Sequence, residues 1–318
     1  MKAESHSLKA GILEGIRVLD LSRMLSGPYA TMLLADHGAE VIKIESAEGD
    51  SSRRSGPFKE HDLKRNWSGY FISLNRNKKS ICLNLKNGDD LAFFKKLIEK
   101  SDVLVENFRP GVMNRLGLSF DEVSKINPRI VYGSISGFGS DIFGESPYKN
   151  WPSYDVVAQA MGGLISLTGY DEENPLKVGP GIADIFSGSL LSFGLLASIL
   201  KARDTGRAQF VEVAMYDAII SMCERAIYQY DFNNVIPKPE GNGHPLLAPF
   251  GIYKAKDGFI AIGIVEDSYW NILKKIIASD DILNDLKYGT ISLRAQNRKE
   301  LNEKINKWTE RFNKKELI

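Results

Sequence analysis

Short apolar segments alternate with amphipathic segments over the first 135 residues, and this alternation limits the possible folds more than any other feature. Residues 16–21 (IRVLDL) predict a strand, residues 28–37 a helix that opens at Pro28 and ends at Gly38, and residues 40–45 (EVIKIE) a second strand. Such a β-α-β unit joins parallel strands by a right-handed crossover. The pattern therefore predicts an α/β chain built on a parallel sheet.

The alternation continues with predicted strands at residues 80–85, 102–105 and 129–135 and predicted helices at residues 89–100 and 120–126. This order favours a Rossmann-like, doubly wound sheet. The first strand-to-helix turn lacks the GxGxxG fingerprint, which disfavours a nicotinamide-dependent oxidoreductase. Residues 47–69 are polar and aperiodic and predict a long loop, which in a compact domain is usually functional or mobile.

The length and the distribution of glycine and proline indicate two domains. A chain of 318 residues exceeds what a single hydrophobic core usually organises. We expect residues 1–232 to form the large Rossmann-like domain, residues 233–249 a linker or flap, and residues 250–318 a small α+β domain that starts with a hairpin. The sequence stops within an uncapped helical pattern, WTERFNKKELI, which suggests that a C-terminal return segment is missing.

Charge and cysteine usage exclude several classes of protein. The formal net charge is +1, which disfavours a general nucleic-acid binder. The two cysteines, Cys82 and Cys223, have no CxxC spacing, and the four histidines form no ligand motif, so we expect neither a disulfide framework nor a metal site. The first residues lack an apolar signal region and no span is predicted. These features predict a cytoplasmic protein without a membrane segment.

One carboxylate stands at the mouth of a long apolar run. Residues 179–181 are Gly-Pro-Gly, Asp184 follows, and an almost continuous apolar stretch then reaches residue 199 before cations and Gly206. The stretch predicts a helix buried on most sides, ended by the glycine. Asp184 is either a helix N-cap or a carboxylate nucleophile that the helix N-terminus keeps ionised, and these two interpretations are compatible.

Several segments, taken together and in order, resemble the class III CoA-transferase family of the CaiB/BaiF type, which includes formyl-CoA transferase, carnitine CoA-transferase and the α-methylacyl-CoA racemases. The resemblance runs from about residue 11 to the end of the chain. The segments that carry it are GIRVLDLSRMLSGPYATMLLADHGAEVIKIE, NRNKKSICLNLK, DVLVENFRPGVMNRLG, INPRIVYGSISGFG, YDVVAQAMGG, GIADIFSG, TGRAQFVEVAMYDA and GNGHPLLAPFGIYKAKDG.

The resemblance implies an activity and a catalytic residue. In the transferases the aspartate of the segment matched by GIADIFSG is the nucleophile, which gives Asp184 this role. Its carboxylate would attack the thioester of an acyl-CoA to form an aspartyl anhydride, and the released CoA would convert this into an aspartyl-CoA thioester. The acceptor carboxylic acid would then leave as the new thioester. Acyl-CoA and the acid are substrates, and the resemblance implies no metal or tightly bound cofactor.

The resemblance also implies contacts with CoA, at Met24, Leu25, Leu83, Lys86, Asn107, Phe108, Arg115 and Tyr154. The side chains of Lys86 and Arg115 are suited to phosphates, and that of Phe108 to the adenine or the pantetheine. The alternatives are solvated surface charges and a core phenylalanine. Leu25 stands where formyl-CoA transferase has glutamine, and Ser46 stands where it has an arginine that contacts CoA. These differences argue against oxalate and formyl-CoA as substrates.

Two other functions remain open at this stage. The racemases pair the aspartate with a histidine at the position occupied here by Tyr154, and a phenol with a pKa near ~10 is a poor base at neutral pH. His244 is another candidate base. A noncatalytic CoA-binding protein would require Asp184 to serve only as a cap.

The family resemblance further implies a homodimer of ring-shaped chains that interlock. In such a dimer the active site lies between the large domain of one chain and the small domain of the other, with residues 241–244 closing over the thioester.

Overall fold

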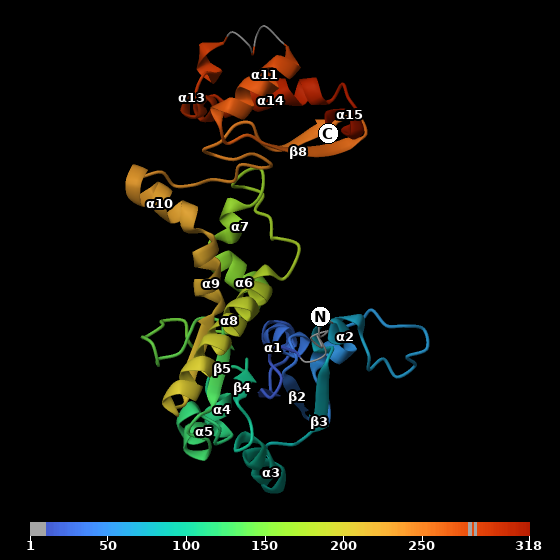
Figure 1. Cartoon of the computed structure of the whole chain (residues 1–318), viewed down its shortest axis with the longest axis vertical. Helices are drawn as coiled ribbons and strands as arrows, with labels where there is room; N and C mark the ends of the chain where they lie inside the picture. Colours follow the sequence, from blue (N-terminus) through green and yellow to red (C-terminus); the bar gives the residue numbers. More distant parts are fainter. Residues whose placement is uncertain (1–10, 279–281, 283–284) are drawn as a thin grey trace, which may run out of the picture. The chain divides into compact units, whose positions relative to one another are not determined.

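The computed structural model describes residues 11–278, 282 and 285–318. The chain divides into two compact units (Figure 1). The first contains the described residues up to Leu164 together with Lys177–Asn233, and the second contains Ile165–Leu176 and Asn234–Ile318. The first residues, on which the absence of a signal region was argued, lie outside the described part.

The first unit alternates strands and helices as its sequence predicts. Its elements as far as the fourth strand are β1 (Arg17–Asp20), α1 (Ser26–Asp36), β2 (Glu40–Glu45), η1 (Ser51–Arg54), α2 (Gly69–Asn75), β3 (Lys78–Cys82), α3 (Gly88–Ile98) and β4 (Val103–Glu106). They are followed by α4 (Val112–Arg115), α5 (Phe120–Ile126), β5 (Val131–Ser136), α6 (Asp155–Met161), α8 (Ile182–Thr205), β6 (Gln209–Ala214), α9 (Met215–Met222) and α10 (Glu224–Asn233). The short α7 (Leu164–Leu167) lies at the boundary of the units.

Six parallel strands form the sheet of this unit, in the order β3-β2-β1-β4-β5-β6. Val18 of β1 pairs with Val41 on one side and with Val103 of β4 on the other. The strand order therefore reverses between β1 and β4, and in open α/β sheets the crevice beyond the carboxyl ends of such neighbouring strands is the usual ligand site. The predicted parallel, Rossmann-like sheet is confirmed.

Helices cover both faces of the sheet. On one face, side chains from β1, β4 and β5 pack with α3 and α5 around Phe94, Leu104 and Val123. On the other face α8 lies against β5 and β6. A Cβ atom on Gly133 of β5 would lie 2.9 Å from a methyl group of Leu195, so the glycine lets the apolar helix approach the strand closely.

Small residues also bring α8 against α1, and the two helices lie side by side in Figure 1. A Cβ atom on Gly188 would lie 2.6 Å from the carbonyl oxygen of Ser26, and the hydroxyl of Ser192 donates to the carbonyl of Ala30 at 3.2 Å. Among the described residues, α8 is the one helix long and apolar enough to cross a bilayer. Its packing on α1, β5 and β6 is that of a core helix.

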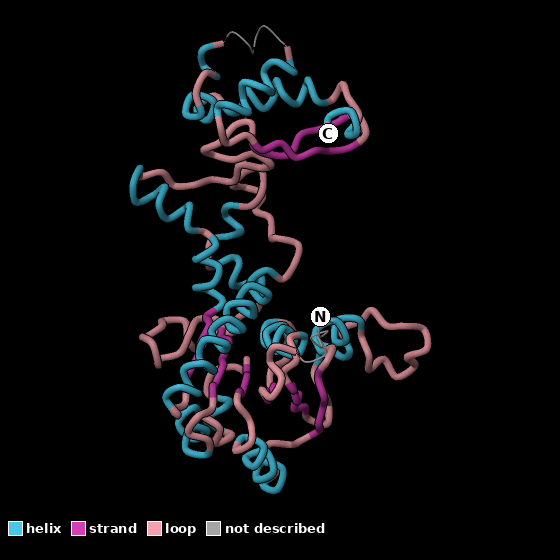
Figure 2. The backbone as a smooth tube through the Cα atoms, in the orientation of Figure 1, coloured by secondary structure: helices cyan, strands magenta, loops and turns pink. Residues whose placement is uncertain are grey.

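The second unit has its own core around an antiparallel hairpin. Its elements are β7 (Phe250–Ala255), β8 (Gly258–Gly263), α11 (Asp267–Ile277), η2 (Leu286–Tyr288), α13 (Ile291–Gln296), α14 (Arg298–Thr309) and α15 (Lys314–Leu317). The hairpin predicted around residues 256–258 is confirmed. Figure 2 shows the two strands of the hairpin in magenta and the helices of this unit in cyan. The apolar core of the unit includes Trp270, Tyr288 and Leu301.

Several element boundaries differ from the sequence prediction, and three differences bear on the site. The long helix begins at Ile182, before Asp184, because the turn at residues 179–181 ends earlier than the apolar run suggests. Helix α1 begins at Ser26, so Pro28 is its third residue and not its first. The predicted loop 47–69 contains the short η1, and the unpredicted α2 follows it, capped by the hydroxyl of Ser68 on the N–H of Phe71.

The contact between α1 and α8 predicts a steric effect on stability. Gly188→Ala should lower the free energy of unfolding by about 1–3 kcal/mol, because the new methyl group meets backbone and not a flexible side chain. Urea denaturation measures this change. The control is Gly88→Ala in α3, where a Cβ meets nothing within 4 Å and the change should stay within about 1 kcal/mol. Equal losses in both variants would contradict this account of the packing.

Candidate active site

A cavity of about 580 Å³ lies beyond the carboxyl ends of β1 and β4 in the first unit. It brings together five residues predicted to form the site, namely Met24, Asn107, Phe108, Tyr154 and Asp184. They come from the loop after β1, the loop after β4, the start of α6 and the first turn of α8. Residues about 160 positions apart in sequence thus meet at the crevice that the strand order predicts.

Asn107 fastens the loop after β4 to the loop after β1. Its side-chain oxygen accepts a hydrogen bond from the N–H of Arg23 at 2.8 Å, and its amide nitrogen donates to the carbonyl of Arg23 at 2.8 Å and to the hydroxyl of Ser26 at 3.2 Å. The side chain of Asn107 therefore bonds to both the N–H and the carbonyl group of Arg23. The amide of Asn107 is a structural clamp at the edge of the cavity.

Phe108 is held by the buried carboxyl group of Glu106 at the end of β4. That group accepts hydrogen bonds from the N–H of Phe108 at 2.8 Å and from the hydroxyl of Ser134. Burial is the largest cause that raises the pKa of Glu106, to about 7, and these hydrogen bonds oppose it. The guanidinium carbon of Arg23 lies 5.6 Å from the centroid of the Phe108 ring, so an aromatic face and a cation lie together at the cavity.

Asp184 lies where the N-termini of two helices meet. It occupies the first turn of α8, whose N-cap is Gly181, and its carboxylate is hydrogen-bonded by the hydroxyl and the backbone of Ser26, the first residue of α1. Helix N-termini attract negative charge because their first N–H groups have no partner within the helix. The half-buried carboxylate is therefore fixed in place while one side remains open to the cavity.

The capping of α8 comes from Asp155 and not from Asp184. The carboxylate of Asp155 accepts hydrogen bonds from the N–H of Ala183 at 2.8 Å and from the N–H of Asp184 at 3.4 Å. Gln159 donates to its second oxygen at 2.6 Å and accepts from the N–H of Val178 at 3.0 Å. The interpretation of Asp184 as a simple N-cap is therefore wrong, because another carboxylate already serves the helix terminus.

The electrostatic expectation for Asp184 also needs correction. The helix terminus is expected to stabilise the charged form of Asp184. Instead, burial raises the pKa of Asp184, the nearby charge of Asp155 raises it further, and the hydrogen bonds from Ser26 only partly oppose these two effects. The resulting pKa is about 6, above the ordinary 3.8. The carboxylate is still about tenfold more often ionised than protonated at pH 7.

Tyr70 of α2 lines the same cavity and was not predicted as a site residue. Burial raises the pKa of its phenol to about 12, with further contributions from the charges of Asp184, Asp50 and Asp155. The hydroxyl therefore stays protonated and can only act as a hydrogen-bond donor or acceptor. Its sequence signal was weak, because it follows a polar loop with no apolar period.

The comparison with known families decides what kind of protein contains this site. The sequence profile of CoA-transferase family III matches residues 13–318.

This chain belongs to CoA-transferase family III.

Individual relatives agree with this assignment. The succinyl-CoA:mesaconate CoA-transferase of Haloarcula marismortui is 39% identical over 308 residues, which cover 97% of this chain and 77% of the relative. The acetyl-CoA:oxalate CoA-transferase of Acetobacter aceti is 38% identical over 87% of this chain and 70% of its own length. The crystal structure of a CaiB/BaiF family protein from Brucella suis superposes with a TM-score of 0.83 at 31% identity, over 97% of this chain and 81% of that chain.

The other four residues that are expected to contact CoA do not line the cavity that contains Asp184. Leu25 packs towards the turn before α8, where a Cβ on Gly181 would lie 2.8 Å from its methyl group. Leu83 is 8% exposed and belongs to the apolar core. Lys86 and Arg115 are exposed, on the loop after β3 and on α4. Their contacts with CoA stay predictions.

Sequence reasoning missed three residues that interact with Asp184, namely Ser26, Tyr70 and Asp155. Asp155 directly follows the predicted Tyr154, but its hydrogen bond to α8 joins residues 28 positions apart and has no local signature in the sequence. Ser26 follows Leu25 directly, and only the packing of α1 on α8 turns it towards Asp184. In the described residues no group of three or more His, Cys, Asp or Glu side chains could hold a metal ion.

The raised pKa of Asp184 predicts a pH-dependent stability difference. Between 3.8 and about 6 the folded protein keeps a proton that the unfolded chain has released, so the stability of the wild type falls as pH rises through this window. Asp184→Asn lacks this titration. The unfolding free energy of the variant minus that of the wild type should therefore increase from about pH 4 to about pH 7 in urea titrations. A constant or shrinking difference would contradict the raised pKa.

Proposed function

We propose that this family III CoA-transferase moves CoA from an acyl-CoA to a free carboxylic acid and that Asp184 carries the acyl group. The observation that supports this most is the position of the Asp184 carboxylate, half-buried at the N-termini of α1 and α8 and open to a cavity of about 580 Å³. A carboxylate that has lost part of its hydration, yet is mostly ionised at neutral pH, is a usable nucleophile towards a thioester.

The proposed reaction needs four balanced substitutions at carbonyl carbons. An oxygen of Asp184 attacks the carbonyl carbon of the donor thioester, and the C–S bond breaks. This step forms an anhydride between Asp184 and the donor acyl group and releases the CoA thiolate. The thiolate then attacks the aspartyl carbonyl, which gives an aspartyl-CoA thioester and releases the donor acid. The acceptor carboxylate attacks this thioester to form a second anhydride and thiolate. The thiolate finally attacks the acceptor's carbonyl carbon, which forms the new acyl-CoA and restores Asp184.

Each substitution places negative charge on a carbonyl oxygen, and Tyr70 is placed to stabilise it. Its phenol lines the cavity and stays protonated well above neutral pH. A donor aimed at a developing oxyanion in a site that excludes water contributes more than the same donor in water. We therefore assign Tyr70 the role of a hydrogen-bond donor to the reacting acyl group.

The cations of the cavity suggest the class of acyl group. Arg23, Arg109 and Lys177 all line the cavity, and each is able to bind a second carboxylate on the substrate. The names of the two relatives given above contain succinyl-CoA, mesaconate and oxalate, which derive from dicarboxylic acids, besides acetyl-CoA, which does not. We propose a dicarboxylic acid and its CoA thioester as substrates, with succinyl-CoA as the first donor to test. Lys86 and Arg115 remain the proposed contacts for the CoA phosphates.

We also propose a homodimer, supported by exposed apolar side chains on the first unit. Phe193 and Leu200 of α8 are 74% and 70% exposed, and Phe232 of α10 is 80% exposed. Exposed aromatic and aliphatic groups of this size are typical of surfaces that a partner covers. Light scattering measures the mass in solution, and a monomer at micromolar concentration would remove this part of the proposal.

Asp184→Asn should abolish acyl exchange and leave CoA binding unchanged, because the amide keeps the shape of the side chain but is no nucleophile. Exchange is measured with labelled succinate and succinyl-CoA, and binding by calorimetry. Hydroxylamine and borohydride should trap the wild type on the peptide that contains Asp184. Asp204→Asn, at the other end of α8, is the matched control and should keep full exchange. Exchange that persists in Asp184→Asn would exclude the proposed role.

Tyr70→Phe should reduce kcat/KM for exchange about 100-fold, which is the usual loss when one oxyanion donor is removed. The folded state should change little, because the ring and its packing remain. Tyr230→Phe on α10 removes an exposed hydroxyl outside the cavity and serves as the control. Equal rates for Tyr70→Phe and the wild type would leave Tyr70 without a catalytic role.

A further inference from the structure

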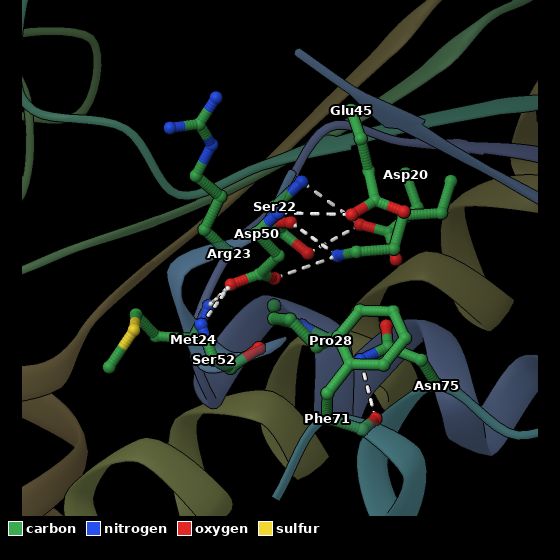
Figure 3. A network of polar contacts seen from close by, with 12 residues as sticks. Asp20, Ser22, Arg23, Met24, Pro28, Glu45, Asp50, Ser52, Phe71 and Asn75 are labelled. Carbon is green, nitrogen blue, oxygen red and sulfur yellow. Dashed lines mark hydrogen bonds and ion pairs between the residues drawn. The ribbon is translucent and has the colours of Figure 1, made fainter. Parts of the chain in front are cut away.

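Six buried or partly buried charged side chains form a network around the loop that precedes α1. Figure 3 labels its three carboxylates, Asp20, Glu45 and Asp50, beside the loop residues Ser22 and Met24. The network consists of three carboxylates and three cations, namely Asp20, Glu45, Asp50, Lys43, Arg53 and Lys78. Their formal charges cancel. Because removing each ion from water is costly, such a network is weak evidence for stability.

One ion pair of this network holds the loop backbone directly. Lys43 is 1% exposed, pairs with Asp50 at 3.1 Å and donates a hydrogen bond to the carbonyl of Ser22 at 2.8 Å. The other oxygen of Asp50 accepts from the N–H of Met24 at 3.3 Å and from the N–H of Ser52 at 2.9 Å. The pair therefore binds the backbone of Ser22 and of Met24, the two neighbours of Arg23 in the chain. The backbone of Arg23 itself is bound by the side chain of Asn107.

Met24 needs such a support because its backbone is strained. Its φ angle is +65°, in the left-handed region that a residue with a side chain rarely adopts. A conformation of this kind is unfavourable and persists only where its surroundings enforce it. The strained residue lines the substrate cavity, and two positions later Ser26 hydrogen-bonds to Asp184. The geometry of the loop thus determines both the cavity wall and the nucleophile's partner.

We propose that Asp50, held by its buried ion pair with Lys43, is a positioning residue of the transferase. It fixes Met24 in the left-handed conformation and so sets Ser26 against Asp184. Neither Asp50 nor Lys43 lines the cavity, so both act through the loop. This inference rests on the proposed function for its effect on catalysis, but the loop geometry it describes is independent of that function.

A second ion pair of the network, between Lys78 and Asp20, binds α1 and not the loop before it. Lys78 pairs with Asp20 at 2.9 Å and donates to the carbonyl of Pro28 at 2.9 Å, while Asp20 accepts from the hydroxyl of Thr31 at 2.7 Å. These bonds hold the body of α1 against the sheet. When the pair of Lys43 and Asp50 is removed, α1 therefore keeps its anchor from Pro28 onwards, whereas the loop before it loses the bonds to Ser22 and Met24.

The test replaces both partners at once with Lys43→Met/Asp50→Leu. Exchanging a buried ion pair for apolar residues of similar volume is often neutral or stabilising, so the fold should survive in thermal and urea denaturation. We expect faster hydrogen–deuterium exchange at residues 22–26 and a kcat/KM about 100-fold lower, the scale of a small misplacement of reacting groups. Arg17→Gln/Glu40→Gln removes an ion pair at the opposite edge of the sheet and should change neither.

The single variant Asp50→Asn separates positioning from stability. Its oxygen can still accept from the N–H of Met24, but Lys43 loses its counter-charge, so stability should fall while the folded fraction keeps slow amide exchange at residues 22–26. Slow amide exchange and wild-type kinetics in the folded double variant would overturn the proposal. If the wild type transfers no acyl group, the proposed function fails, and amide exchange still decides whether the pair positions the loop.

Discussion

The close contact between α1 and α8 is the constraint on which the rest of the site depends. It exists because Gly188 leaves room for the carbonyl of Ser26 and because a serine one turn later bonds across to α1. Two helices that pack in this way bring their N-termini together at one edge of the sheet. Asp184 lies at that meeting point, and the strand reversal between β1 and β4 opens a cavity beside it.

The pKa of Asp184 results from effects that oppose one another. Helix N-termini and the Ser26 hydrogen bonds favour the charged form of Asp184, whereas burial and the like charge of Asp155 disfavour it, and the second group prevails. The resulting pKa of about 6 leaves a carboxylate that is ionised at neutral pH but easier to acylate than one stabilised in water. Asp155 thus has two roles, as the cap of α8 and as the charge that tunes its neighbour.

Much of the fold could be predicted from local patterns. Strand and helix periods identified the parallel sheet, and the glycine at position 206 correctly ended α8 in a left-handed conformation. Asp184 could be singled out because it precedes an apolar run. The functions of Tyr70 and Asp155 could not, because each depends on contacts between segments distant in the chain. The backbone strain at Met24 also leaves no trace in the sequence, since methionine has no preference for that conformation.

The central claim is that Asp184 becomes covalently linked to each acid in turn, and oxygen transfer tests it most directly. When the acceptor acid carries oxygen-18 in its carboxylate, the proposed substitutions leave one labelled oxygen on the enzyme's carboxylate after each turnover. Mass spectrometry of the peptide containing Asp184, after turnover with succinyl-CoA and the labelled acid, should therefore find heavy oxygen in that side chain. Turnover that leaves Asp184 unlabelled would contradict the account.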